Sequence, residues 1–458
     1  MNYSLLHDAY FGSGGFATGA YLTRHKRESE EDYRFRCENA YYLNYFAPIV
    51  NALVDPIFKR KPQRDYKSSV DDVLRDFLQD VDGGGTSIDT FMKRAAITAK
   101  VYGVSFIVVD MAQANSVRNM AELRRERAYP YFRILLPHEI NGSNNYGIDQ
   151  SGNLTYIEFR EVSGISEGTV KYQYCRYARD GWRKTGDDLA ATQGSYNLGR
   201  VPVIPLFSRL LEQKTMLPNP DMMPIAAVAK AIYNHCSWLG EILRNQTFPL
   251  LTIPSLDAKE MTIGTNNALG YSPDSSHQPD FIAPPSDPAS ILQTQIASLI
   301  QEMYRMASLS FMQSSSSAEK ISGVARQWEF ERTNQQLASF ARSISKAEET
   351  AVNIFARYLN ADINYTVTYP DDFGITDVES ELKQAQEVLD LGLTDELRID
   401  VLKKVISAYL PDVGADRTDE LVKSAEKAEQ DRIHAERLYS DPQTNNEPSG
   451  DKAPEQGG

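Results

Sequence analysis

The chain has 458 residues, 41% hydrophobic and 24% charged, so it can bury large cores and should divide into about three domains. Its 62 acidic and 48 basic residues give a net charge of −14, the wrong sign for gripping nucleic acid by phosphate neutralisation. No apolar run approaches the roughly 20 residues that cross a bilayer, and no signal peptide begins the chain. Cys37, Cys175 and Cys236 lack the spacing of a disulfide framework or a zinc site. We expect a soluble protein that folds in a cytoplasm, with buried, reduced thiols.

Aromatic residues dominate a first predicted helix, from Glu30 to Phe58, which Pro48 should kink or divide. Because aromatic side chains occupy nearly every face, this helix is either buried among neighbouring elements or packed against another subunit. The sequence leaves both possibilities open. Upstream, the Gly12–Gly15 segment GSGG is expected to be a flexible terminus, since it lacks the preceding strand that a phosphate-binding loop requires.

The next part of the chain predicts an α+β core followed by a sheet. A short helix is expected over Asp71–Gln79, and Ser87 is a good N-cap for a helix that runs through Val101. The apolar, β-branched run Val104–Asp110 is typical of a buried strand. From Tyr131 to Phe207 the hydrophobic pattern has period two and is divided by turn signals, which predicts an antiparallel sheet built from hairpins.

Two amphipathic helices then flank an irregular module. The first is expected over Asp221–Thr247, and the second over Ala289–Ala307. Between them, Phe248–Pro288 is rich in Pro, Gly, Ser and Asn, with short strand-like pieces at Leu250–Ile253 and Phe281–Ala283.

A serine-rich loop and a longer helix follow. The loop contains Ser314–Ser317, which have no apolar side chain to bury and favour local backbone hydrogen bonds over a helix. From Ile321 to Tyr358 a single apolar stripe at spacings of three and four predicts a helix of more than thirty residues. A strand at Tyr365–Tyr369 and three shorter helices between Thr376 and Leu438 come next, and the tail from Ser440 is expected to be disordered.

Catalytic signals are poor. The chain has no G-x-S-x-G, P-loop, H-E-x-x-H or G-x-G-x-x-G motif, and its six histidines are scattered. His235 stands beside Cys236, but adjacent helical positions point about 100° apart, so packing explains the pair better than metal binding. We therefore expect a protein that is not an enzyme and holds neither cofactor nor metal.

The order of elements does not suit a compact monomer, because the two flanking helices would expose too much apolar surface. It suits helices that pack side by side around a ring. This order resembles that of the portal proteins of tailed bacteriophages, the head-to-tail connectors of podovirus-like type. The resemblance is carried by DAYFGSGGFATGAYLTRHKRESEEDYRFRCENAYYLNYFAPIVNALVDPIFKRKP, by PIAAVAKAIYNHCSWLGEILRNQTFPLL and by ISGVARQWEFER, and it covers roughly residues 8–375.

The resemblance implies an α+β portal fold with an α/β wing, a long helical stem, a small α/β clip, a tunnel loop and a helical crown, assembled as a ring. The implied boundaries are wing 1–220, first stem helix 221–247, clip 248–288, second stem helix 289–308, tunnel loop 309–320, long wing helix and strand 321–375, crown 376–438 and disordered tail 439–458.

The resemblance also implies a function: a ring at one capsid vertex through which double-stranded DNA is packaged and ejected. Its implied partners are further copies of this chain, twelve in number, the terminase large subunit, a head-to-tail adaptor, and the major capsid and scaffold proteins. The protein would be assembled in the host cytoplasm and reside in the virion, with no membrane partner. Twelve copies would carry 12 × −14 = −168 formal charges, and an electronegative channel would let DNA slide.

Site residues follow from the same mapping. The tunnel-loop residues that would face DNA are Ser310, Met312, Gln313, Ser314, Ser315, Ser316, Ser317 and Lys320, and the clip residues that would face terminase or adaptor are Lys259, Asn266, Asn267, Tyr271 and Asp274. Two alternatives stay open: a head-to-tail adaptor or collar protein that only joins rings, and an acidic cytoplasmic hydrolase.

Overall fold

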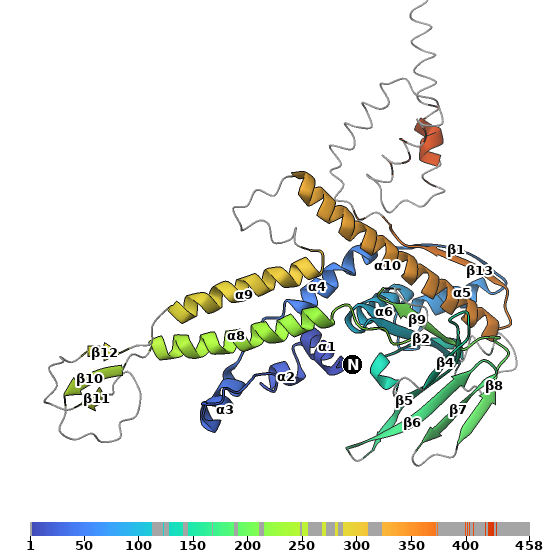
Figure 1. The fold of residues 1–458 in the computed structure, drawn as a ribbon. Coiled ribbons are helices and arrows are strands. Elements are labelled where there is room, and N and C mark those ends of the chain that lie inside the picture. The colour runs from blue at the N-terminus through green and yellow to red at the C-terminus, as the bar shows by residue number, and fades with distance from the viewer. Residues whose placement is uncertain are drawn as a thin grey trace, which may run out of the picture. The chain divides into compact units, whose positions relative to one another are not determined.

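The computed structural model describes residues 2–111, 122, 128–140, 145–166, 168–186, 191–209, 215–247, 250–254, 268–271, 280–282, 287–309, 323–371 and 373, with scattered helical positions between 399 and 427. The chain divides into two units, Met1–Phe373 and Gly374–Gly458. The first unit mixes helices with four sheets, in agreement with the predicted α+β class (Figure 1). In the second unit the described positions are helical, and the predicted crown and tail otherwise lie outside the described residues.

The N-terminal region consists of short helices rather than the single helix predicted over residues 30–58. They are α1 (Tyr3–Phe11), α2 (Gly14–Ala17), α3 (Glu30–Asn39), α4 (Phe46–Ala52) and the 3-10 turn η1 (Asp55–Phe58). The break falls at residues 40–45, where the Tyr42 ring stacks on Phe16 at 3.9 Å and its hydroxyl donates to the Ala9 carbonyl. Pro48 lies in the first turn of α4, where no intrahelical N–H is needed, so it does not divide a helix.

The GSGG segment is an ordered corner, which corrects the expectation of a flexible terminus. Gly12 ends α1 in the left-handed region at φ 63°, and α2 begins at Gly14. The Asp8 carboxylate accepts hydrogen bonds from the Gly15 N–H and, at 2.6 Å, from the Tyr21 hydroxyl. A Cβ on Gly14 would lie 2.3 Å from that carboxylate, so the corner depends on glycine at this position.

The predicted helix–strand core is present. It comprises β1 (Gln63–Ser68), α5 (Asp71–Gln79), α6 (Ile88–Tyr102) and β2 (Val104–Met111). The Ser87 hydroxyl accepts from the Thr90 N–H, which confirms the predicted N-cap. Gly103 ends α6 with φ 84°, so β2 starts in the opposite direction directly after the helix.

The region 131–207 forms parts of two sheets and not one. Its strands are β3 (Pro130–Leu135), β4 (Tyr146–Ile148), β5 (Leu154–Ser166), β6 (Thr169–Ala178), β7 (Gly181–Gly186), β8 (Thr192–Ser195) and β9 (Val203–Phe207), with a 3-10 turn η2 (Pro137–Glu139). The hairpins β4-β5-β6-β7-β8 form one antiparallel sheet, as predicted. The flanking strands β3 and β9 instead pair with the two edges of β2, because the backbone N–H and C=O groups of this buried strand need hydrogen-bond partners on both edges.

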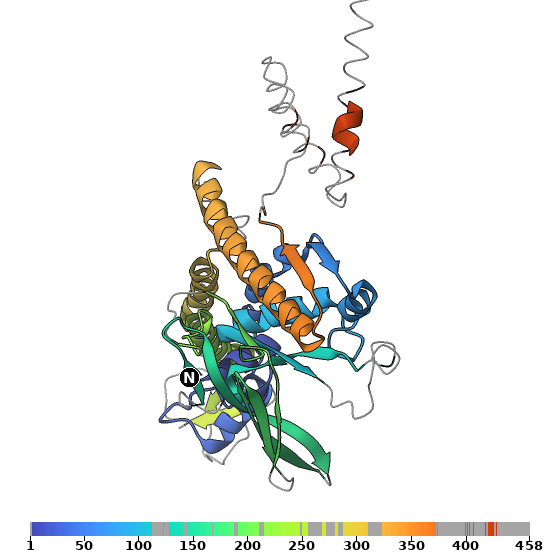
Figure 2. The same cartoon turned by 90° about the vertical axis from the view of Figure 1, so that its right-hand side faces the viewer.

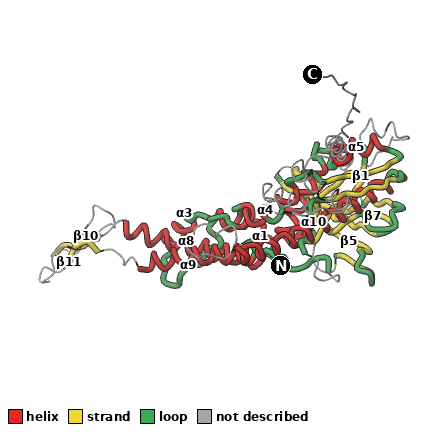
Figure 3. The backbone as a smooth tube through the Cα atoms, turned by 90° about the horizontal axis from the view of Figure 1, so that it is seen from above, coloured by secondary structure: helices red, strands yellow, loops and turns green. Residues whose placement is uncertain are grey.

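Two long helices, which we call the stem, lie between the α+β body, which we call the wing, and a small sheet. Helices α8 (Met223–Thr247) and α9 (Asp287–Met306) lie side by side (Figures 1 and 3), close to the predicted bounds. At their shared end stand β10 (Leu250–Pro254), β11 (Ala268–Tyr271) and β12 (Asp280–Ile282), in the order β11-β10-β12. Two of these strands were predicted; β11 was not, since the four residues ALGY show no alternation.

The long helix α10 (Gly323–Tyr358) has 36 residues and is therefore about 54 Å long. It crosses the β3-β2-β9 sheet and packs against β13 (Ile363–Thr368), as Figure 2 shows. The apolar stripe predicted from the sequence is buried here; it includes Leu337, Phe340, Ile344 and Ala351. β13 pairs with β1, a strand that the sequence did not reveal.

Candidate functional site

The stem is a candidate functional region because two helices, rather than a sheet, carry the small module away from the wing. α8 and α9 have 25 and 20 residues, which corresponds to about 37 and 30 Å. Their apolar stripes, with Ile232 and Cys236 on α8 and Ile296 and Met303 on α9, enter one core together with the N-terminal helices. The stem is thus fixed to the wing at one end, and its outer surface remains exposed.

The exposed face of α9 carries no charge over most of its length. No Asp, Glu, Lys or Arg occurs between Pro288 and Gln301, and the exposed polar residues are Ser290, Gln293, Thr294, Gln295, Ser298 and Gln301. Such a surface neither attracts nor repels phosphate groups. It can also be covered by another chain without the cost of burying an ion.

Large apolar side chains are also exposed along the stem and α10. Ile291 is 66% exposed and Trp328 is 73% exposed, and Trp238, Leu243 and Met306 are partly exposed as well. Single exposed apolar residues are ordinary on protein surfaces, but Trp and Met are the types that interfaces favour. These residues are candidate contacts for another copy of the chain.

Leu309, the first residue of the predicted tunnel loop, lies at the end of the stem. Leu309 is only 1% exposed, belongs to the stem core, and donates its N–H to the Tyr304 carbonyl at 2.8 Å. The preceding Ser308 has φ 60°, and its carbonyl accepts a 2.6 Å hydrogen bond from the Thr333 hydroxyl on α10. The end of α9 is therefore joined to α10, and residues 310–322 span the interval between them.

Most of the predicted site residues lie outside the described part of the chain. They are Ser310, Met312, Gln313, Ser314, Ser315, Ser316, Ser317 and Lys320 in the loop, and Lys259, Asn266, Asn267 and Asp274 in the clip. Tyr271 is described as the last residue of β11, in register with Pro254 of β10. The roles of all these residues stay predictions.

A charged cluster that the sequence analysis missed joins two of the wing sheets, β3-β2-β9 and β4-β5-β6-β7-β8. Asp110 on β2 accepts hydrogen bonds from the Tyr177 hydroxyl at 2.6 Å, the Tyr131 hydroxyl at 3.3 Å and the Lys184 ammonium at 3.3 Å. Its neighbour Glu161 pairs with Arg133 on β3. The sequence signal that could have revealed this cluster is Asp110 at the end of the run VSFIVVD, because a charge that ends a buried strand needs partners of opposite charge or hydrogen-bond donors.

This cluster does not offer a nucleophile. Burial, followed by the Glu161 carboxylate that accepts from its Sγ at 3.0 Å, raises the pKa of the Cys175 thiol. Burial and Asp110 raise the pKa of Tyr177 in the same way. A thiol or phenol with a raised pKa stays protonated near neutral pH, so the cluster holds the sheets together and does not activate a reacting group.

The described ranges contain neither a metal-binding cluster nor a helix that could span a membrane. No group of three or more His, Cys, Asp or Glu side chains among these residues is placed to hold a metal ion. No helix described here is long and apolar enough to cross a membrane. The three cysteines are free thiols; Cys175 and Cys236 are buried, and Cys37 is half-buried.

Comparison with known proteins gives structural similarities only. No protein-family model and no curated protein matches the chain. Similar solved structures include the neck of an empty gene transfer agent (GTA) particle computed with C6 symmetry, at 11% identity and a TM-score of 0.42, over 78% of this chain and 90% of the other. A chain of the virion of the native GTA particle matches at 10% identity and a TM-score of 0.42, over 88% of this chain and 93% of the other. The neck of the native GTA particle computed with C12 symmetry matches at 10% identity and a TM-score of 0.40, over 82% of this chain and 88% of the other.

Proposed function

We propose that this chain is the portal subunit of a tailed-phage-like particle, a structural protein that assembles into a ring of twelve around a DNA channel. The observation that carries the proposal is the stem. Two long paired helices hold a small three-stranded module at one end and a three-sheet wing at the other, and the long α10 follows directly. The solved chains described above come from particle necks and a virion, which is the setting proposed here.

Within this proposal the parts of the chain have separate roles. The module at the far end of the stem is the clip, where the terminase large subunit docks during packaging and a head-to-tail adaptor docks later. Residues 309–320, of which Leu309 is held in the stem core, form the tunnel loop, and α10 fixes the distance of this loop from the ring axis. The wing contacts the major capsid and scaffold proteins at the portal vertex of the virion. The ring conducts double-stranded DNA, and a separate ATPase supplies the energy.

The uncharged face of α9 and the exposed apolar residues of the stem suit such an assembly. Twelve stems packed around an axis would cover side chains such as Ile291 that are open to water in one copy. The serine-rich loop would then present small polar groups that neither stack on a base nor pair with a phosphate.

Electron microscopy of the purified protein tests the proposal. The expected image is a closed ring with a central hole wide enough for duplex DNA, and twelve subunits when its symmetry is counted. Monomers at micromolar concentration, or rings without a hole, contradict it.

A second experiment separates a portal from an adaptor that only joins rings. Deletion of Ser314–Ser317 should reduce the packaging or retention of DNA while leaving ring assembly intact. An adaptor would package normally after this deletion. Turnover of ATP or phosphoesters by the purified ring would favour the hydrolase instead.

A further inference from the structure

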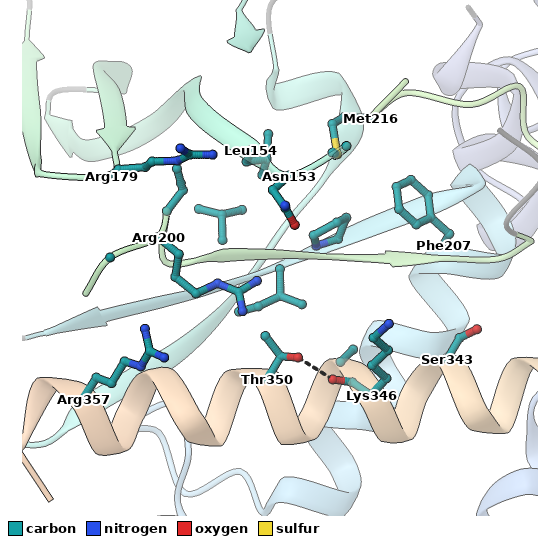
Figure 4. Close-up of a pocket in the computed structure, with 17 residues that line it drawn as sticks. Asn153, Leu154, Arg179, Arg200, Phe207, Met216, Ser343, Lys346, Thr350 and Arg357 are labelled. Atoms are coloured by element: carbon teal, nitrogen blue, oxygen red, sulfur yellow. Dashed lines mark hydrogen bonds between the residues drawn. The ribbon is translucent and has the colours of Figure 1, made fainter. Parts of the chain in front are cut away.

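A cavity of about 590 Å3 lies between α10 and the strands of the wing. Figure 4 shows Lys346 and Arg357 projecting into it from α10, and Arg200, from the segment before β9, pointing toward the helix from the other side. Arg179 lies above them at the end of β6. We call this cavity the basic cleft.

The basic cleft contains four cations, and none of its lining residues is Asp or Glu. Two of the cations are engaged: Arg179 pairs with Asp149, and Arg357 donates to the Leu198 carbonyl at 2.6 Å. Within the described part of the chain, Arg200 and Lys346 have no carboxylate partner. Burial, together with Arg357, lowers the pKa of Arg200, which means that its positive charge is held at an energetic cost. A negative group entering the cleft would remove this cost.

The same unit carries an acidic surface on α5. Between Asp71 and Asp82 the sequence has five acidic residues and one basic residue. The apolar side of α5 is buried, with Phe77 only 1% exposed, and this orientation leaves Asp71 and Asp72 exposed in the first turn. The carboxylates are thus presented outward on a fixed helix.

The acidic surface and the basic cleft lie on opposite sides of α10. The Phe77 ring of α5 stacks on Phe355 of α10 with a centroid distance of 4.0 Å. Lys346, in the cleft, is nine residues before Phe355, which at 3.6 residues per turn is two and a half turns. A molecule with complementary surfaces on opposite sides associates head to tail, and such contacts close into rings when the rotation allows.

We propose that the basic cleft of one copy receives the exposed α5 carboxylates of a second copy, so that neighbouring subunits are joined head to tail by this ionic contact. The inference rests on the ring assembly of the proposed function and does not depend on the passage of DNA. Charge complementarity argues for a second copy: the chain is acidic overall, and each copy that brings a basic cleft also brings an acidic α5.

Charge reversal on either side tests the contact. The variants R200E/K346E and D71K/D72K should each raise the protein concentration at which half of the chain is assembled by at least about tenfold, measured by native mass spectrometry and light scattering in 0.15 M salt. Mixing the two variants should restore rings in which they alternate, because every contact in such a ring joins surfaces of opposite charge. The quadruple variant, which restores opposite charges across the contact, should assemble within about threefold of the unmodified chain.

The matched control is K171E/R176E, which reverses two exposed cations on β6 outside the cleft and should assemble normally. Equal melting temperatures of the variants exclude misfolding, and R200Q/K346Q replaces the reversed pair if that variant melts early. Assembly of R200E/K346E at the unmodified concentration, or no recovery in the quadruple variant, overturns the contact.

Two other outcomes have separate meanings. If R200Q/K346Q assembles normally but loses binding to a fluorescent DNA duplex, the basic cleft binds phosphate groups and the proposal is wrong. If the unmodified chain stays monomeric, both this contact and the portal proposal fail. Rings that form regardless of these charges overturn the contact alone.

Discussion

Removal of the Glu348 carboxylate should weaken the attachment of α10 to the wing more than any exposed charge change. Glu348 is fully buried, and its Oε1 accepts from Arg64 Nε at 2.8 Å. The hydroxyls of Tyr365 and Tyr369 each donate to the carboxylate at 2.5 Å. One side chain of α10 therefore connects β1 and β13, the two strands that sequence analysis did not pair.

The expected cost follows from these four groups. Loss of one member of a buried ion pair typically costs 3–5 kcal/mol, because the other charge stays buried. In E348A, Arg64 keeps a second partner, since its Nη1 lies 2.7 Å from Asp89 Oδ1, but both tyrosine hydroxyls lose their acceptor. We expect a loss of about 4 kcal/mol in the free energy of unfolding. Replacement of both ions in R64L/E348L should recover part of this loss.

Urea unfolding followed by circular dichroism measures these differences, with the subunit concentration kept constant because assembly also stabilises the chain. The control is E158A, which removes the partner of Arg176 in an exposed pair and should cost less than about 1 kcal/mol. If E348A costs no more than E158A, or if R64L/E348L is less stable than E348A, the buried carboxylate does not hold α10 as described.

Three further substitutions test other parts of the fold. Burial lowers the pKa of Lys100 to about 8 from the usual 10.5. Between these two pH values the unfolded chain binds more protons than the folded chain, so the stability of the protein rises with pH. K100M should abolish this rise, which is worth up to about 3 kcal/mol, in melting curves from pH 7 to 10.5. G103A should cost about 1–2 kcal/mol in urea titrations, because φ is 84° and a Cβ would lie 3.0 Å from the Pro220 Cα. Y177F should cost about 1–2 kcal/mol by the same measurement, since Asp110 loses its shortest hydrogen bond. Unchanged stability of G103A or Y177F, or a rise with pH that persists in K100M, would contradict the corresponding contact.

The elements that the sequence predicted well are those with a local cause. The spacing of Phe340 and Ile344 specifies a helix whatever surrounds it, and Ser87 caps α6 through its own near neighbour, Thr90. The prediction of a single helix over residues 30–58 was wrong because the ring of Tyr42 packs on Phe16 and Tyr233. This long-range packing outweighs the helical propensity of the residues around Tyr42. Local pattern alone contains no trace of such a contact.

Pairings between distant strands and sites built from distant residues could not be predicted in the same way. β1 and β13 are about 300 positions apart, and the period-two pattern of 131–207 does not say that its ends pair with β2. The stem was recognisable from its two amphipathic helices. The basic cleft was not, because Arg200 and Lys346 are each unremarkable until α10 crosses the wing.

The distribution of charge leads to a last prediction about how the proposed channel avoids holding DNA. After Phe373 the sequence has 20 acidic and 10 basic residues, so the C-terminal unit carries −10 of the net −14, and residues 1–373, with 42 acidic and 38 basic residues, carry −4. If weak adhesion depended on overall repulsion of phosphates, a chain ending at Phe373 would bind duplex DNA, with an affinity that falls steeply with salt.

We expect instead that rings of the shortened chain remain non-adhesive, because the exposed face of α9 and the serine-rich loop supply almost no cations to pair with phosphates. Filter binding of a labelled duplex at 50 and 200 mM salt should show no gain over the complete chain. As a positive control, Q295K adds one cation per subunit to the α9 face, and binding should appear in low salt if this face lines the channel. Tight, salt-dependent binding by the shortened chain alone would show that the acidic C-terminal unit, and not the uncharged lining, keeps the DNA free.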